Sequence, residues 1–150
     1  MPMLTDLIAA SPDDASAILV TQGHANVWST LELPAITPAQ WASLRFVLMR
    51  QPAEVRALAD YLKGFERLGA SPDSVEGDPW LVALPEDLSL LMAQMSLEEI
   101  AEHASNWQAL ETSRGQPVLA LDLEALLAEL AAFAASALAQ GQRLLLWICP

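Results

Sequence analysis

The apolar run that ends this chain constrains its fold more than any other feature. Residues 144–148, Leu-Leu-Leu-Trp-Ile, follow Gly141, the residue type that commonly ends a helix in the left-handed conformation. The run is too short for another core helix, so we expect residues 143–149 to form a buried β-strand. A lone buried strand would leave backbone donors and acceptors unpaired, so a partner strand is needed. Residues 80–84, an apolar run between Pro79 and Pro85, are the natural partner.

Helix start signals divide the first half of the chain. Proline follows a plausible N-cap at Ser11, Thr37 and Gln51, which predicts helices over residues 12–20, 38–50 and 52–68. We also expect a short helix over residues 4–10. Residues 21–36 fit either an extended segment or an irregular loop. The stretch 69–78 is rich in Ser, Pro, Asp and Gly and is typical of a loop.

The helix predicted over residues 52–68 has an amphipathic pattern. Its apolar positions recur at spacings of three and four, which predicts one buried stripe and one solvated face. The expected stripe comprises Val55, Leu58, Ala59, Leu62 and Phe65, and the solvated face carries Arg56, Asp60, Lys63 and Arg67.

In the second half, three further helices are expected. One covers residues 86–95. The next opens with a capping box at Ser96 and Glu99 and ends near residue 110. The longest is capped by Asp122 and ends near Gln140, while residues 118–121 are briefly extended. With the strands above, these elements predict a mainly helical α+β fold, with a small sheet that includes the C-terminal strand.

The length and composition indicate that residues 1–150 form a single globular domain. A chain of 150 residues buries roughly 68–70% of the surface that its unfolded form exposes, which is ample for a core. Apolar residues make up 53% of the sequence and charged residues 17%, a composition that excludes an intrinsically disordered chain.

The order of elements in the second half resembles that of a known group of proteins. An apolar strand ending at Pro85 leads into a helix, Ser96 and Glu99 open another, and a long helix stops at Gly141 before the final strand. Over residues 78–149 this resembles the small uncharacterised bacterial proteins of the YfbM-like type. The resemblance implies a cytoplasmic α+β domain with no assigned activity, and it supplies no functional residue.

Charge is strongly segregated along the chain, whose formal net charge is −12. Five of the seven basic residues fall within residues 45–67, whereas residues 68–113 carry nine acidic residues and no basic one. Such polarity steers association with partners of opposite charge. The net negative charge disfavours nucleic-acid binding and binding to an anionic membrane surface, because both depend on attraction between anionic groups and Lys or Arg.

The sequence also indicates a compartment. Its first residues lack the basic region of a signal peptide, and its longest nearly uncharged run is shorter than the roughly 20 residues that cross a bilayer. The only cysteine, Cys149, has no internal disulfide partner. We therefore expect a cytoplasmic protein.

Recognisable catalytic motifs are absent, so we expect no catalytic residue, no metal site and no cofactor. His103 shares a helix face with Glu99, which would suit two metal ligands or an oriented base, although an acidic helix face carrying one histidine is the simpler interpretation. His24 lies in the unassigned stretch and is compatible with a pocket or with an ordinary loop.

Two functional hypotheses follow. The first is a small acidic protein-binding domain, immunity- or antitoxin-like, that recognises a basic partner through Glu98, Glu99 and Glu102, with Trp28 as an exposed aromatic anchor. The second is a small enzyme or ligand-binding domain with a pocket near His24 and Trp28. The oligomeric state is not specified by the sequence.

Overall fold

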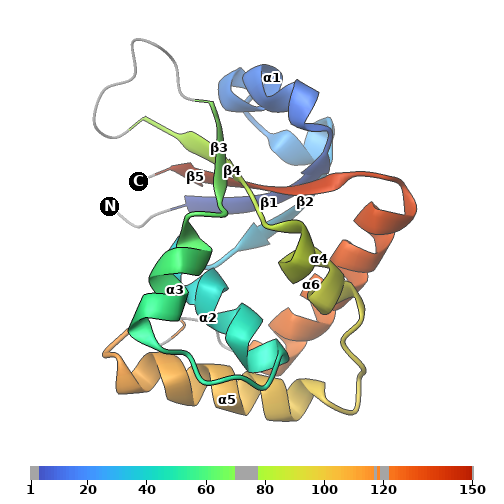
Figure 1. The fold of residues 1–150 in the computed structure, drawn as a ribbon. Coiled ribbons are helices and arrows are strands. Elements are labelled where there is room, and N and C mark those ends of the chain that lie inside the picture. The colour runs from blue at the N-terminus through green and yellow to red at the C-terminus, as the bar shows by residue number, and fades with distance from the viewer. Residues whose placement is uncertain (1–3, 70–77, 117, 119–121, 150) are drawn as a thin grey trace.

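The C-terminal segment lies in the middle of a five-stranded antiparallel sheet (Figure 1). A computed structural model describes residues 4–69, 78–116, 118 and 122–149. The strand order is β2-β1-β5-β4-β3, and the strands are β1 (Leu4–Ala10), β2 (Ser29–Leu33), β3 (Glu66–Gly69), β4 (Trp80–Ala83) and β5 (Arg143–Cys149). The predicted C-terminal strand is confirmed, and its predicted partner pairs with it from Trp80 opposite Ile148 to Ala83 opposite Leu145.

The prediction of a helix over residues 4–10 is wrong, because this segment is strand β1. Residues 7–10, Leu-Ile-Ala-Ala, are at most 3% exposed, so the strand is buried on both faces at this end. Such a strand reads as a continuous apolar run without alternation, which periodicity alone does not distinguish from a helix. β1 pairs with the edge of β5 that β4 does not occupy, with Leu7 opposite Leu146. The sheet therefore has more strands than the sequence predicts.

The helices follow the predicted order with shifted ends. They are α1 (Ala15–Val20), preceded by the 3₁₀ turn η1 (Pro12–Asp14), then α2 (Pro38–Leu48), α3 (Val55–Leu62), α4 (Glu86–Ala93), α5 (Ile100–Ser113) and α6 (Leu123–Ala139); a second 3₁₀ turn, η2 (His24–Asn26), precedes β2. Thr37 and Gln40 form a full capping box at the start of α2, and the Asp122 side chain caps α6. Ser96 caps no helix, because α5 begins at Ile100 and Glu99 occupies its N-cap position.

The segment predicted as one helix over residues 52–68 contains a helix and a strand. α3 ends at Leu62, and β3 begins at Glu66, so Arg67 lies on a strand and its guanidinium rests over the Trp80 ring. Leu58 is buried as expected, whereas Val55 is 82% exposed because it lies in the first turn of α3. The predicted loop over 69–78 and the predicted extended stretch over 118–121 fall mostly outside the described residues.

The two faces of the sheet are covered very differently. The main core lies between one face and helices α2, α4, α5 and α6, with Trp41, Leu88, Trp107 and Leu130 all fully buried. The other face carries a smaller cluster, covered by Ala15 and Ile18 of α1 and by Trp28. In Figure 1 the sheet accordingly lies between α1 on one side and the helical layer on the other.

These observations confirm the predicted fold class, a mainly helical α+β domain whose sheet includes the C-terminal strand. Within the described residues, no helix combines the length and the apolar character that crossing a membrane requires.

Candidate functional site

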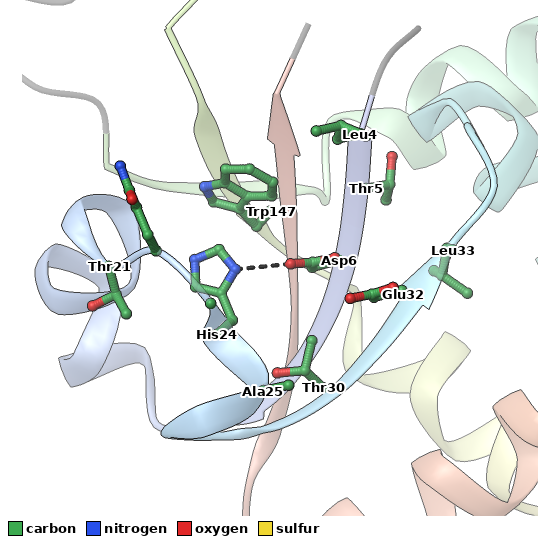
Figure 2. Close-up of a pocket in the computed structure, with 12 residues that line it drawn as sticks. Leu4, Thr5, Asp6, Thr21, His24, Ala25, Thr30, Glu32, Leu33 and Trp147 are labelled. Atoms are coloured by element: carbon green, nitrogen blue, oxygen red, sulfur yellow. Dashed lines mark hydrogen bonds and ion pairs between the residues drawn. The ribbon is translucent and has the colours of Figure 1, made fainter.

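A pocket of about 450 Å³ opens at one end of the thinly covered sheet face. Its walls come from β1, η2, β2 and β5, so segments from both ends of the chain build it (Figure 2). The polar and aromatic side chains that line it include Asp6, Thr21, His24, Thr30, Glu32 and Trp147.

His24 is held in the wall of this pocket by the local turn. Gly23 adopts a left-handed conformation with φ of 72°, which turns the chain into η2. A side chain at Gly23 would be unfavourable there, because L-residues rarely adopt this positive φ. The turn buries the imidazole, which is 4% exposed, and places its ring 4.8 Å from that of Trp147 in an edge-to-face arrangement.

Both ring nitrogens of His24 face acceptor oxygens. Nδ1 lies 2.8 Å from the Oδ2 atom of Asp6, and Nε2 lies 2.9 Å from the carbonyl oxygen of Ile18. An ionised carboxylate and a carbonyl can only accept hydrogen bonds. A ring with a proton on both nitrogens would donate to both oxygens and would carry a charge opposite to that of Asp6.

The sheet register aligns three of the pocket side chains in one row. Asp6 of β1 lies opposite Glu32 of β2 and, on its other side, opposite Trp147 of β5. Side chains directly opposite one another on neighbouring strands point to the same face, about 5 Å apart. The row thus places two carboxylates next to each other and next to an indole, an arrangement in which like charges repel.

Among the residues that the structure describes, no cation pairs with Glu32. None of the hydrogen bonds or ion pairs within the described residues involves its carboxylate, whereas that of Asp6 is held by His24. The seven Lys and Arg residues all belong to described segments, and none of them lines the pocket. Within the described residues, Asp6 therefore has His24 as a partner, whereas the carboxylate of Glu32 has none.

Sequence reasoning identified only part of this site. His24 lies in a pocket, as the second hypothesis expects. Trp28 is half-buried against the smaller core, 6.3 Å from the His24 ring, and is therefore less exposed than predicted. Trp147 lies on the predicted C-terminal strand, and its ring also lines the pocket. The sequence patterns do not identify Asp6 and Glu32, because the segment of Asp6 resembles a helix and that of Glu32 fits either a strand or a loop.

The predicted acidic surface lies elsewhere, at the start of α5. Glu98, Glu99 and Glu102 are all exposed there. Two of the three nevertheless have an internal partner: Arg50 donates to both carboxylate oxygens of Glu102, at 2.6 and 3.1 Å, and lies 3.9 Å from Glu99. The hydrogen bonds and charge of Arg50 lower the pKa of Glu102. Glu98 has no hydrogen bond or ion pair within the described residues.

The possible metal pair at Glu99 and His103 is incomplete. His103 Nε2 lies 3.4 Å from Oε2 of Glu99, as their spacing predicts, and the imidazole is 2% exposed. No third ligand joins them, since the described part of the chain contains no group of three His, Cys, Asp or Glu side chains suited to a metal ion. The His24 ring contacts Trp147 on the face of the smaller cluster, whereas α5 packs on the other face of the sheet, so the two histidines do not form one site.

Comparison with known proteins assigns no function to the chain. No protein-family model matches the chain, and no curated protein matches its sequence. Among solved structures it is similar to the crystal structure of YfbM from Escherichia coli, a protein of unknown function. The match has 15% identity and a TM-score of 0.46, and it covers 97% of this chain and 99% of that one. No residue role is transferred from it.

Proposed function

We propose that this chain is a binding domain whose pocket at His24 receives an organic cation, an ammonium or guanidinium group. The observation that carries the proposal is the row of Glu32, Asp6 and Trp147 across three strands, with one carboxylate left uncompensated. Pockets that combine apolar walls with a few convergent polar groups are the usual location of ligand sites.

Two side chains of the pocket, Glu32 and Trp147, suit a cation. A positive group beside Glu32 would gain a charge-assisted hydrogen bond and would reduce the repulsion between Glu32 and Asp6. Trp147 adds an aromatic surface, and tryptophan attracts cations more strongly than the other aromatic side chains. Such a contact contributes about 0.5–1 kcal/mol at an exposed site. An anionic ligand would instead approach two carboxylates and is disfavoured.

The geometry supports binding more than acid–base catalysis. A general base needs a nitrogen that can accept a proton from the substrate. Both nitrogens of His24 already lie within hydrogen-bond distance of internal oxygens, and the ring is 4% exposed. The enzyme alternative therefore lacks support from the residue on which it was based.

A cation pocket also accommodates the hypothesis of a basic partner. The net charge of −12 favours encounter with positively charged molecules. An immunity- or antitoxin-like domain in the cytoplasm, bound to a basic protein, is one form that such a function would take.

The proposal is tested by NMR titration of ¹⁵N-labelled protein. We expect butylammonium or butylguanidinium to shift the indole N–H signal of Trp147, which is assigned with Trp147→Phe. Butanol and butyrate, which have the same chain without the positive charge, should leave the signal in place. Glu32→Gln should weaken cation binding several-fold, whereas Glu129→Gln, at an exposed position of α6, should not. Equal shifts with butanol, or unchanged binding by Glu32→Gln, would contradict the proposal.

A further inference from the structure

The pocket lies beside an edge of the sheet. β2 is the first strand in the order and pairs with β1 alone, in unbroken register from Ser29 opposite Ala9 to Leu33 opposite Thr5. Within the described residues, no backbone hydrogen bond reaches its outer edge. Alternate N–H and C=O groups of β2 therefore remain available to another strand.

The opposite edge of the sheet is less suited to pairing. β3 has four residues, and its register with β4 shifts between Arg67 and Gly69. Short and irregular edge strands resist the addition of a further strand, because the hydrogen-bonding groups are no longer evenly spaced. β2, with five residues in regular register, is the better template.

Strand addition at β2 would extend the row of pocket side chains. A new strand lies about 4.8 Å from its neighbour, and the residue opposite Glu32 points to the same face. A lysine or arginine at that position would place its charge beside Glu32, and its long flexible stem would extend toward Asp6. The row would then run from the partner's cation through Glu32 and Asp6 to Trp147.

The charge of Glu32 makes this edge selective. A charged side chain on an edge strand discourages pairing with strands that carry no matching charge, including a second copy of this acidic chain. A basic strand gains an ion pair where an acidic strand meets repulsion. One apolar side chain adjoins the site, since Leu4 lines the pocket and is 58% exposed.

From these observations we propose that the occupant of the pocket is a lysine or arginine side chain on an extended segment of a basic protein, which pairs with the outer edge of β2. This inference rests on the proposed cation pocket and specifies the partner. Backbone hydrogen bonds supply affinity, and the side chain opposite Glu32 supplies specificity.

The test uses fluorescence anisotropy with labelled seven-residue peptides of alternating Thr and Val, with lysine at the centre. We expect this peptide to bind at least ten-fold more tightly than butylammonium and than the same peptide with a central glutamate. Two further lysine peptides carry N-methyl groups on alternate residues, one peptide for each edge of the strand. Only the peptide methylated on the edge that faces β2 should lose binding, by ten-fold or more.

Protein variants check the register. Glu32→Lys should reverse the preference, so that the glutamate peptide binds more tightly than the lysine peptide. Glu129→Lys, on α6, makes the same change of charge away from the pocket and should keep the original preference. Circular dichroism establishes that both variants fold.

The outcomes separate the two proposals. If butylammonium shifts the Trp147 signal but both methylated peptides bind like their parent, strand addition is wrong and the cation pocket stands. If neither butylammonium nor the lysine peptide shifts that signal, the cation pocket is wrong and this inference fails with it.

Discussion

Replacing Asp6 removes the carboxylate that lies 2.8 Å from Nδ1 of the buried His24 ring. In Asp6→Ala, Nδ1 is left without a hydrogen bond. Leaving a buried polar group unpaired costs about 1–3 kcal/mol. Because the His24 side chain is 3% exposed, we expect the upper end of that range, about 3 kcal/mol. For a domain of 150 residues this corresponds to a decrease in Tm of roughly 6–12 °C.

Asp6→Asn should be much less damaging. The amide can donate to Nδ1 of a neutral imidazole while Nε2–H still donates to Ile18, so both hydrogen bonds persist and the expected loss is about 1 kcal/mol. Urea unfolding at pH 7, followed by tryptophan fluorescence, measures both variants. Glu32→Gln is the control and should lie within about 0.5 kcal/mol of the wild type. Equal losses for Asp6→Ala and Asp6→Asn would refute the assigned hydrogen bonds.

Three further predictions concern stability. Arg50 has φ of 54° at the end of α2, so Arg50→Gly should be about 1 kcal/mol more stable than Arg50→Ala in urea melts. As a control, Ala101→Gly on α5 should be about 1 kcal/mol less stable than the wild type. Equal stability of the Gly and Ala variants at position 50 would contradict this prediction. Burial raises the pKa of the Glu111 carboxyl, which adds stability that is fully present below the pKa of the unfolded chain and is lost as the pH rises through the pKa of the folded protein. Glu111→Gln should therefore lose less stability than the wild type between pH 4 and 7. An identical pH dependence of the two proteins would contradict this prediction. In the same melts, Leu58→Ala should lose about 2–5 kcal/mol of unfolding free energy, because Leu58 is buried and its removal leaves a cavity. Val55→Ala should lose under about 0.5 kcal/mol, because Val55 is exposed. Similar losses for the two variants would show that the orientation of α3 is wrong.

Sequence patterns predicted the elements whose signals are local. β5 follows a glycine helix stop, β4 is bounded by prolines, and α2 and α6 have side-chain caps, so short windows of sequence identify them. β1 lacks such a signal, because both faces of its second half are buried. Its identity depends on pairing with β5, which lies more than 130 residues further along the chain.

The pocket was hidden for the same reason. Asp6 and Glu32 become neighbours only through the register of β1 with β2, and Trp147 joins them only through the register of β1 with β5. The spacing of residues within a single segment cannot predict these contacts, because they arise between strands that are far apart in the sequence. His24 could be noted from its polar, glycine-containing surroundings, but its partner lies on a strand that was assigned to a helix.

The two acidic regions differ in what a basic partner would gain from them. At the start of α5, the carboxylate of Glu102 already accepts two hydrogen bonds from Arg50, so a partner must displace an existing ion pair. In the pocket, Glu32 has no such partner within the described residues, and a cation there adds an interaction without removing one. We therefore expect Glu98→Lys with Glu102→Lys to slow association with the lysine peptide modestly, through long-range charge, and to leave its dissociation rate unchanged. Glu32→Lys should instead raise the dissociation rate, because it removes a direct contact. Stopped-flow measurements at low and high salt distinguish the two effects, and the reverse pattern would place recognition on α5.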